Sequence, residues 1–160
     1  MPPTDRLFED FQVGDLWESP PVVITAEEIV AYGRAFDPQP MHTDAERAAA
    51  GPFGGLVASG WHIASISMRE FHRAGGYGNT PTVGLGIDEL RWQRPVRAGE
   101  AITVAREVVE LRRSASSPGQ GIVRTRVTVR NAQREPVMTL FSAARVPCRS
   151  AVPDTEEPRS

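Results

Sequence analysis

The fold is decided by the stretch Leu56–Phe71, which reads LVASGWHIASISMREF. Apolar residues recur along it at helical spacing, and charged residues gather only at its end, from Arg69 onward. This pattern predicts a helix that is apolar on most of its circumference. Such a helix is stable only when other elements wrap around it, so the rest of the chain has to supply that cover.

Four extended segments follow the predicted helix and can supply the cover. They span about 82–93, 101–113, 121–132 and 136–147, with turn-forming residues between them. Alternation of apolar and polar residues is clearest over Ile122–Arg130. We therefore predict an α+β fold, in which an antiparallel meander wraps around one central apolar helix.

The chain before this helix predicts shorter elements. Residues 7–15 form a leading segment that ends in a Gly-Asp turn, and Val22–Ile24 forms a brief strand. Thr25 and Glu28 have the spacing of a capping box, in which each side chain binds the other residue's backbone amide. A helix is therefore expected over about 26–35.

Prolines end that helix and stiffen the segment after it. Pro38 and Pro40 each lack an amide hydrogen and push the preceding residue out of helical geometry, so an irregular loop is expected over 37–41. Asp44 can cap a second short helix over 45–50.

Composition fits one folded domain. The 160 residues include 18 basic and 20 acidic side chains, for a net charge of −2, and 40% are hydrophobic. We expect one domain over 1–148, followed by a flexible tail at 149–160 that is rich in proline, serine and charge.

Several classes of partner and site are disfavoured. The charge balance gives no basic footprint for nucleic acid, and no run of 18 apolar residues is present for a membrane span. Neither partner is expected, and the protein is predicted to be cytoplasmic. The single Cys148 excludes an intramolecular disulfide, and with only three histidines it excludes the common zinc sites. No metal is expected.

The segment Asp37-Pro-Gln-Pro-Met-His42 carries the clearest candidate chemistry. A carboxylate and an imidazole five positions apart on a stiff loop can converge on one water, which the carboxylate orients and the imidazole deprotonates near neutral pH. The alternative is that Asp before Pro forms an ordinary turn and the histidine is structural. From the residues alone both interpretations stay open.

Other candidates are individually weaker. Gly60 can end the loop that feeds the helix, leaving first-turn amides free for an oxyanion. Taken alone, however, this residue is better explained as a glycine required by close packing or a tight turn. Arg91, Arg94 and Arg97 could contact phosphates or simply form a solvated face. His62, inside the apolar helix, is expected to be a hydrogen-bonded structural side chain.

Three segments, in this order along the chain, resemble the hotdog-fold MaoC-like dehydratases, a family that includes (R)-specific enoyl-CoA hydratases. Residues 37–42, DPQPMH, resemble the family's motif of Asp, Pro, an apolar residue and His. Residues 53–60, FGGLVASG, resemble the segment that follows it. Residues 85–100, LGIDELRWQRPVRAGE, resemble its strand-and-turn pattern R-F-x-x-P-V-x-x-G-D. The resemblance extends over roughly residues 7–147.

This resemblance implies a reaction and roles for three residues. The reaction is syn hydration of a trans-2-enoyl thioester, most simply an enoyl-CoA giving an (R)-3-hydroxyacyl-CoA, or the reverse dehydration. Asp37 and His42 would hold the water, and the Gly60 amide would stabilise the enolate-like thioester oxygen. No metal or redox cofactor is implied, because the thioester is the electron sink, and coenzyme A enters only as part of the substrate.

Departures from the family pattern fall inside these motifs. Gln39 stands where asparagine is usual, and Ser59 replaces the usual histidine before Gly60. The family asparagine helps hold the aspartate, and Gln39, which is one methylene longer, could do this only with a rearranged loop. The bulky Phe36 and Trp61 suggest a short or unusually shaped acyl pocket. Together with the arginines of the turn, the candidates for binding substrate are Gln39, Ser59, Trp61, Arg94 and Arg97.

Alternative functions remain open. The substrate could be a branched or dicarboxylic acyl thioester or an acyl-carrier-protein thioester, or the domain could bind acyl-CoA without catalysis. Hotdog-fold thioesterases typically have an acidic residue on or just before the central helix. Leu56–Met68 contains none, so a thioesterase is disfavoured. An exposed sheet edge is prone to association, so a homodimer or higher homo-oligomer is expected.

Overall fold

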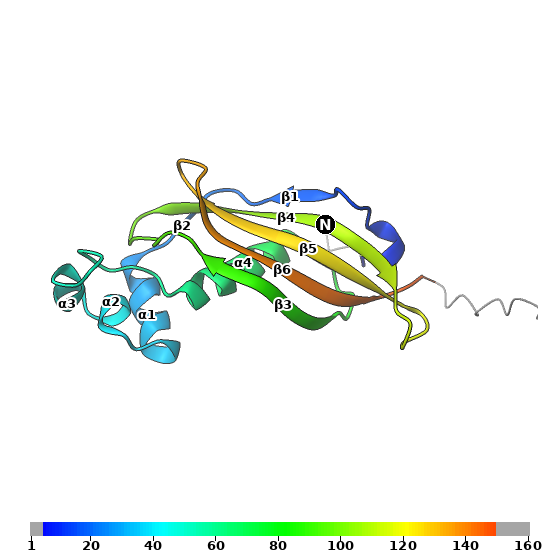
Figure 1. The fold of residues 1–160 in the computed structure, drawn as a ribbon, viewed down its shortest axis with the longest axis horizontal. Helices are drawn as coiled ribbons and strands as arrows, with labels where there is room; N and C mark the ends of the chain where they lie inside the picture. Colours follow the sequence, from blue (N-terminus) through cyan, green and yellow to red (C-terminus); the bar gives the residue numbers. More distant parts are fainter. Residues whose placement is uncertain (1–4, 150–160) are drawn as a thin grey trace, which may run out of the picture.

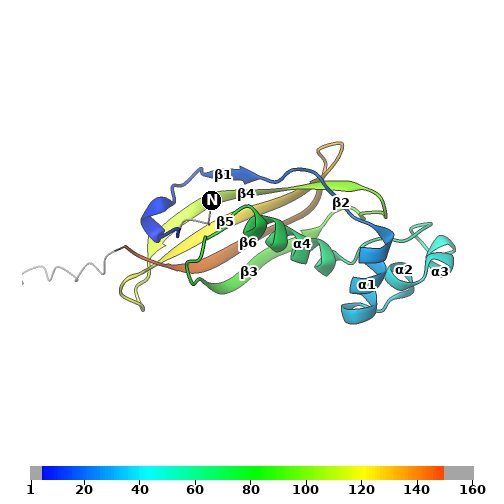
Figure 2. The same ribbon diagram turned by 180° about the vertical axis from the view of Figure 1, so that it is seen from behind.

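The computed structural model describes residues 5–149, in which an antiparallel sheet packs one face against a long helix (Figures 1 and 2). The predicted hotdog architecture is thereby confirmed. Residues 150–160, nearly all of the predicted tail, lie outside the described residues. Within 5–149, no helix has both the length and the hydropathy needed to span a bilayer.

In chain order, the elements are η1 (Phe8–Asp10), β1 (Leu16–Glu18), β2 (Val22–Val23), α1 (Ala26–Phe36), α2 (Pro40–Thr43), α3 (Ala45–Ala49), α4 (Gly60–Arg73), β3 (Val83–Trp92), β4 (Ala101–Arg113), β5 (Gln120–Asn131) and β6 (Pro136–Pro147).

Strand order corrects one part of the prediction. The order is β1-β4-β5-β6-β3, with β2 also paired to β4, so β4, β5 and β6 form the expected meander but β3 pairs with β6 at the far edge. Residues 93–100 connect β3 to β4, and eight extended residues reach about 26 Å, enough to cross the two intervening strands. The short strand β1 was not predicted.

Helix α4 begins four residues later than the apolar pattern suggested. Residues 56–59 are extended, because Val57 bridges to Arg97 and the amide of Ala58 donates to the Val96 carbonyl at 2.8 Å. The helix is also less completely covered than predicted. Trp61 is 53% exposed and Met68 is 42% exposed, so the sheet of one chain covers only part of the circumference.

The core forms where α4 meets the sheet. Helix residues Ile63 and Ile66 pack against alternate side chains of three strands, as the two-residue period of a strand requires. The main strand residues in this cluster are Ile102, Val104, Val127, Val129, Met138 and Leu140.

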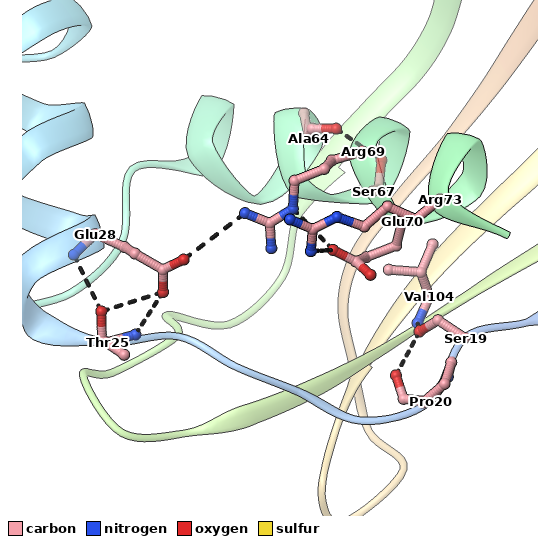
Figure 3. Close-up of polar contacts among 10 residues, drawn as sticks. All are labelled: Ser19, Pro20, Thr25, Glu28, Ala64, Ser67, Arg69, Glu70, Arg73 and Val104. Atoms are coloured by element: carbon pink, nitrogen blue, oxygen red, sulfur yellow. Dashed lines mark hydrogen bonds and ion pairs between the residues drawn. The ribbon is translucent and has the colours of Figure 1, made fainter.

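Helix α1 starts as predicted and is tied to α4. Thr25 and Glu28 form the capping box, with the Thr25 hydroxyl accepting from the Glu28 amide at 3.1 Å (Figure 3). Arg69 then links the two helices: its guanidinium lies 3.7 Å from Glu28 and donates to Glu70 at 2.8 Å. This link connects the first turn of α1 to the C-terminal half of α4.

The expected irregular loop after α1 contains one helical turn. Pro40 occupies the first position of α2, where a missing amide hydrogen costs nothing and the fixed φ favours a helix. Asp44 caps α3 by accepting from the Arg47 amide, as predicted. The three short helices lie together at one end of the sheet, next to the start of α4 (Figures 1 and 2).

Candidate active site

Asp37 ends α1, and two side chains hold its carboxylate. Gln39 Nε2 donates to Oδ1 at 2.9 Å, and Ser59 Oγ donates to Oδ2 at 2.7 Å. The hydrogen bond from Gln39 and then the one from Ser59 lower the pKa of Asp37 against the opposing effect of burial, and the charge of His42 adds to this when its ring is protonated. The carboxylate is therefore held in its ionised form.

His42 lies in α2 with a defined tautomer. Its Nδ1 is 2.6 Å from the Val57 carbonyl oxygen, and because a carbonyl can only accept, Nδ1 carries the proton. In the neutral ring, Nε2 is then the acceptor, and it lies 3.4 Å from Asp37 Oδ2. The ring is buried, and the Val57 amide donates in turn to the Met41 carbonyl, which fixes α2 against this segment.

Gly33 makes the approach of α1 to α2 possible. A Cβ at this position would lie 2.6 Å from the carbonyl oxygen of His42 and 2.9 Å from its Cβ. A side chain there would push α2, and with it the imidazole, away from Asp37.

The start of α4 lies next to Asp37, because its N-cap residue Ser59 contacts the carboxylate. Gly60 is the first residue of the helix, so its amide has no acceptor within the helix. Ser59 is the N-cap but makes no capping hydrogen bond, because its hydroxyl donates to Asp37 instead. The first-turn donors thus stay available to a ligand.

Trp92 packs directly on Gly60. A Cβ at Gly60 would overlap the indole, so only glycine allows this contact. A cavity of about 300 Å³ adjoins it. Asp37 and His42 are not among the residues that line it, which are Phe53, Val57, Ala58, Gly60, Ile63, Trp92, Gln93, Arg94, Pro95, Val96 and Val137.

Two of the predicted substrate-binding residues serve the carboxylate instead. Gln39 and Ser59 are both engaged with Asp37. Trp61 lies at the surface beside Trp92, with ring centroids 5.3 Å apart, and Phe36 is exposed at the end of α1.

The predicted phosphate-contacting arginines are engaged within the chain. Arg94 donates to the Pro136 carbonyl at 2.9 Å and pairs with Glu135 at 3.3 Å, while also lining the cavity at Gly60. Arg97 donates to the Phe53 carbonyl. Both guanidiniums remain exposed, so these contacts leave them reachable from solvent.

The sequence did not identify three groups that shape the site, and it predicted the environment of one histidine wrongly. The Val57 carbonyl gives no side-chain signal, and Gly33 and Trp92 are recognisable only from what they touch. His62 was expected to be hydrogen-bonded, yet its buried Nδ1 has no partner within residues 5–149. The ring stacks on Tyr32 at 4.6 Å, and burial lowers the pKa of His62.

Comparisons with known proteins agree with this architecture. The model of the MaoC-like domain family matches residues 11–131. The 3-hydroxyacyl-thioester dehydratase Z of Mycobacterium tuberculosis is 32% identical over 110 residues, covering 68% of this chain and 73% of the relative. A MaoC-like dehydratase from Rhodospirillum rubrum superposes with a TM-score of 0.78 at 35% identity, covering 90% of this chain and 98% of that one.

A third comparison concerns the fold alone. The unliganded (R)-hydratase of Pseudomonas aeruginosa gives a TM-score of 0.75 at 23% identity, covering 98% of this chain and 96% of that one.

Proposed function

This chain belongs to the MaoC-like domain family, and from that premise we propose that it is a hydro-lyase acting on an acyl thioester. The reaction is the addition of water to a trans-2-enoyl-CoA to give an (R)-3-hydroxyacyl-CoA, or the reverse. The observation that carries the proposal is the His42 Nε2 acceptor facing an ionised Asp37 carboxylate beside the open first turn of α4.

His42 acts first as the base and then as the acid, while Asp37 orients the water and stabilises the charged ring. One water can contact both Asp37 Oδ2 and His42 Nε2 at about 2.8 Å, the usual length of such hydrogen bonds. Nε2 takes a proton as the water oxygen bonds to C3 of the enoyl group, and the ionised carboxylate stabilises the imidazolium that forms. Nε2–H then returns the proton to C2 on the same face, so one water has been added across the double bond.

Gly60 supplies the oxyanion donor. Addition at C3 moves electrons onto the thioester oxygen, where the Gly60 amide at the positive end of α4 stabilises the charge. Removing one such donor typically lowers the rate by about 10²–10³-fold. The thioester is the electron sink, so this scheme uses no metal or redox cofactor.

The remaining predicted residues take supporting roles. Gln39 and Ser59 keep Asp37 ionised and oriented, and they contact substrate only through it. Arg94 and Arg97, exposed beside the cavity at Gly60, contact the phosphates of coenzyme A, and Trp61 borders the entrance with Trp92. Of the five residues predicted to bind substrate, only Trp61, Arg94 and Arg97 contact it directly in this proposal.

The names of the relatives support a thioester substrate. A 3-hydroxyacyl-thioester dehydratase is among the curated relatives. Alternative substrates are branched or dicarboxylic acyl thioesters and carrier-protein thioesters, and a non-catalytic acyl-CoA-binding module is the alternative outside enzymes.

Loss of the enoyl-thioester absorbance of crotonyl-CoA tests the proposal. We expect the wild-type protein to consume the band and Asp37→Asn to be slower by at least about 10²-fold, the usual contribution of an acid/base group. Asparagine keeps the shape, so equal melting temperatures would show that the loss is chemical. Equal rates for the two proteins would refute the role of Asp37. No turnover of crotonyl, branched or dicarboxylic thioesters would favour the binding module.

We also propose that two copies of the chain form a homodimer. Strand β3 is an edge strand that is exposed along nearly its whole length, including Val83, Leu85 and Ile87, and Trp61 and Met68 of α4 are exposed as well. Pairing two β3 edges would cover these apolar groups. Light scattering coupled to size exclusion should give twice the chain mass, and a monomer at micromolar concentration would refute the homodimer.

A further inference from the structure

Arg106 is a buried cation in a row of core residues. It lies on β4, where Ile102, Val104 and Val108 at two-residue spacing all face the core, and only 4% of its surface is exposed. A charged guanidinium at such a position loses its hydration, which is costly unless a partner replaces the water.

The partners within residues 5–149 do not balance this charge. The guanidinium lies over the Phe71 ring at 4.4 Å, and one nitrogen is 3.8 Å from the Met68 sulfur, but Nε has no hydrogen-bond partner. No carboxylate of the described residues pairs with it, whereas Arg126 pairs with Glu107 on the neighbouring strands. Arg106 is therefore a buried donor group that lacks an anion.

A cavity of about 470 Å³ lies in front of Arg106, within the range of pockets that hold small ligands. Its walls are mainly apolar residues of α4, β3 and β6, including Ala64, Met68 and Leu140. No Asp or Glu lines it, and the hydroxyl of Tyr77 beside Arg106 makes no hydrogen bond within the described residues. His72 and the hydroxyls of Ser67, Thr82 and Ser142 also line it, and none of these groups is anionic. The cavity thus combines the Arg106 cation with walls that are apolar over most of their surface.

A second cavity that Arg106 also lines is a poorer place for an anion. Asp10 and Asp15 line it together with Arg6, so two carboxylates offset the two guanidiniums there and leave no net positive charge for an anion. The carboxylate-free cavity is therefore the one that complements an anion.

We propose that this cavity binds a carboxylate at the end of an aliphatic chain, with Arg106 as its receptor. The planar guanidinium matches a carboxylate in shape, and one positive charge balances one negative charge. The apolar walls bury the chain, and the Tyr77 hydroxyl supplies a further donor.

Two sources of such a carboxylate are possible. Ala64 and Met68 follow Gly60 by four and eight residues, about 6 and 12 Å along the helix. The far end of an acyl chain bound at Gly60 could therefore reach Arg106, which would make the substrate a dicarboxylic thioester. This source rests on the proposed function, whereas a free fatty acid does not.

Calorimetric titration of the full chain with decanoate and with 1-decanol tests the site itself. We expect decanoate to bind at least tenfold more tightly than decanol, and Arg106→Met to remove that difference while leaving decanol binding unchanged. Arg112→Met, on the same strand but exposed, is the matched control and should behave as wild type. Equal affinity for decanoate in the wild type and Arg106→Met, or equal binding of acid and alcohol, would overturn the proposal. If Arg106→Met does not fold, the wild-type comparison of acid with alcohol still decides.

Kinetics then identify the source. If the substrate carries the carboxylate, Arg106→Met should lower kcat/KM at least tenfold for an ω-carboxy enoyl thioester and leave kcat/KM for crotonyl-CoA unchanged. Decanoate should then inhibit turnover of the ω-carboxy thioester competitively. If a free fatty acid is the ligand, both thioesters should keep their rates. A wild-type protein inactive on every thioester would refute the proposed function, yet decanoate binding would remain a valid test of Arg106.

Discussion

Replacing Gly60 by alanine tests whether the contact with Trp92 shapes the start of α4. The new Cβ would overlap the indole, so either the ring or the first turn has to move. Overpacking of this kind costs about 1–3 kcal/mol. For a chain of this size, the melting temperature should fall by about 2–12 °C. Displacing the amide should also lower kcat/KM by about 10²–10³-fold.

A double-mutant cycle separates this overlap from other effects of the substitution. In a Trp92→Ala background the overlap is gone, and alanine is a better helix former than glycine by up to about 1 kcal/mol. Gly60→Ala should therefore be neutral or stabilising there, which corresponds to a coupling of about 1–4 kcal/mol between the two sites. Thermal unfolding of the four proteins measures it.

Gly55→Ala is the matched control. Its Cβ would meet only a guanidinium nitrogen of Arg97, at an ordinary 3.9 Å, so stability should change by less than about 0.5 kcal/mol. If Gly60→Ala were equally destabilising with and without the indole, the steric explanation would be wrong.

Three further substitutions test the site and the core. Ser59→Ala removes a donor from the ionised carboxylate of Asp37, so its pKa should rise and the acidic limb of kcat/KM should move to higher pH; an unmoved limb would contradict this coupling. Gly33→Ala should displace His42, lowering kcat and costing about 1–3 kcal/mol in denaturant unfolding, and an unchanged kcat would argue against that displacement. Ile66→Ala should cost about 2–5 kcal/mol by leaving a cavity beneath α4, and a loss below 1 kcal/mol in the same unfolding assay would mean that the core collapses around it.

Much of the fold could be read from local pattern. The alternation over Ile122–Arg130 and the capping pair Thr25 and Glu28 act within one element, so the predicted strand and helix start agree with the structure. The neighbours of β3 could not be read, because a connection of eight residues is compatible with more than one strand order. The start of α4 was also missed, since apolar residues at 56–58 are as compatible with a buried bridge as with a helix.

The site was predictable to the level of residue types. The spacing of Asp37 and His42 identified both as candidates, but it could not show that Gln39 and Ser59 would bind the carboxylate rather than substrate. Arg106 illustrates the same limit. Its spacing from Ile102, Val104 and Val108 can be read from the sequence, but only the structure shows that it is buried with no carboxylate of the described residues beside it.

By itself, the sequence determined the family, the central helix, the long strands and the acid/base candidates. These follow from periodicity and short spacings, which depend on residues close together in the chain. The tertiary structure alone decided the tautomer of His42, the contact of Trp92 with Gly60 and the isolation of Arg106. Each depends on atoms brought together from distant segments, and hydrogen bonding, steric overlap and desolvation act only once those atoms are in contact.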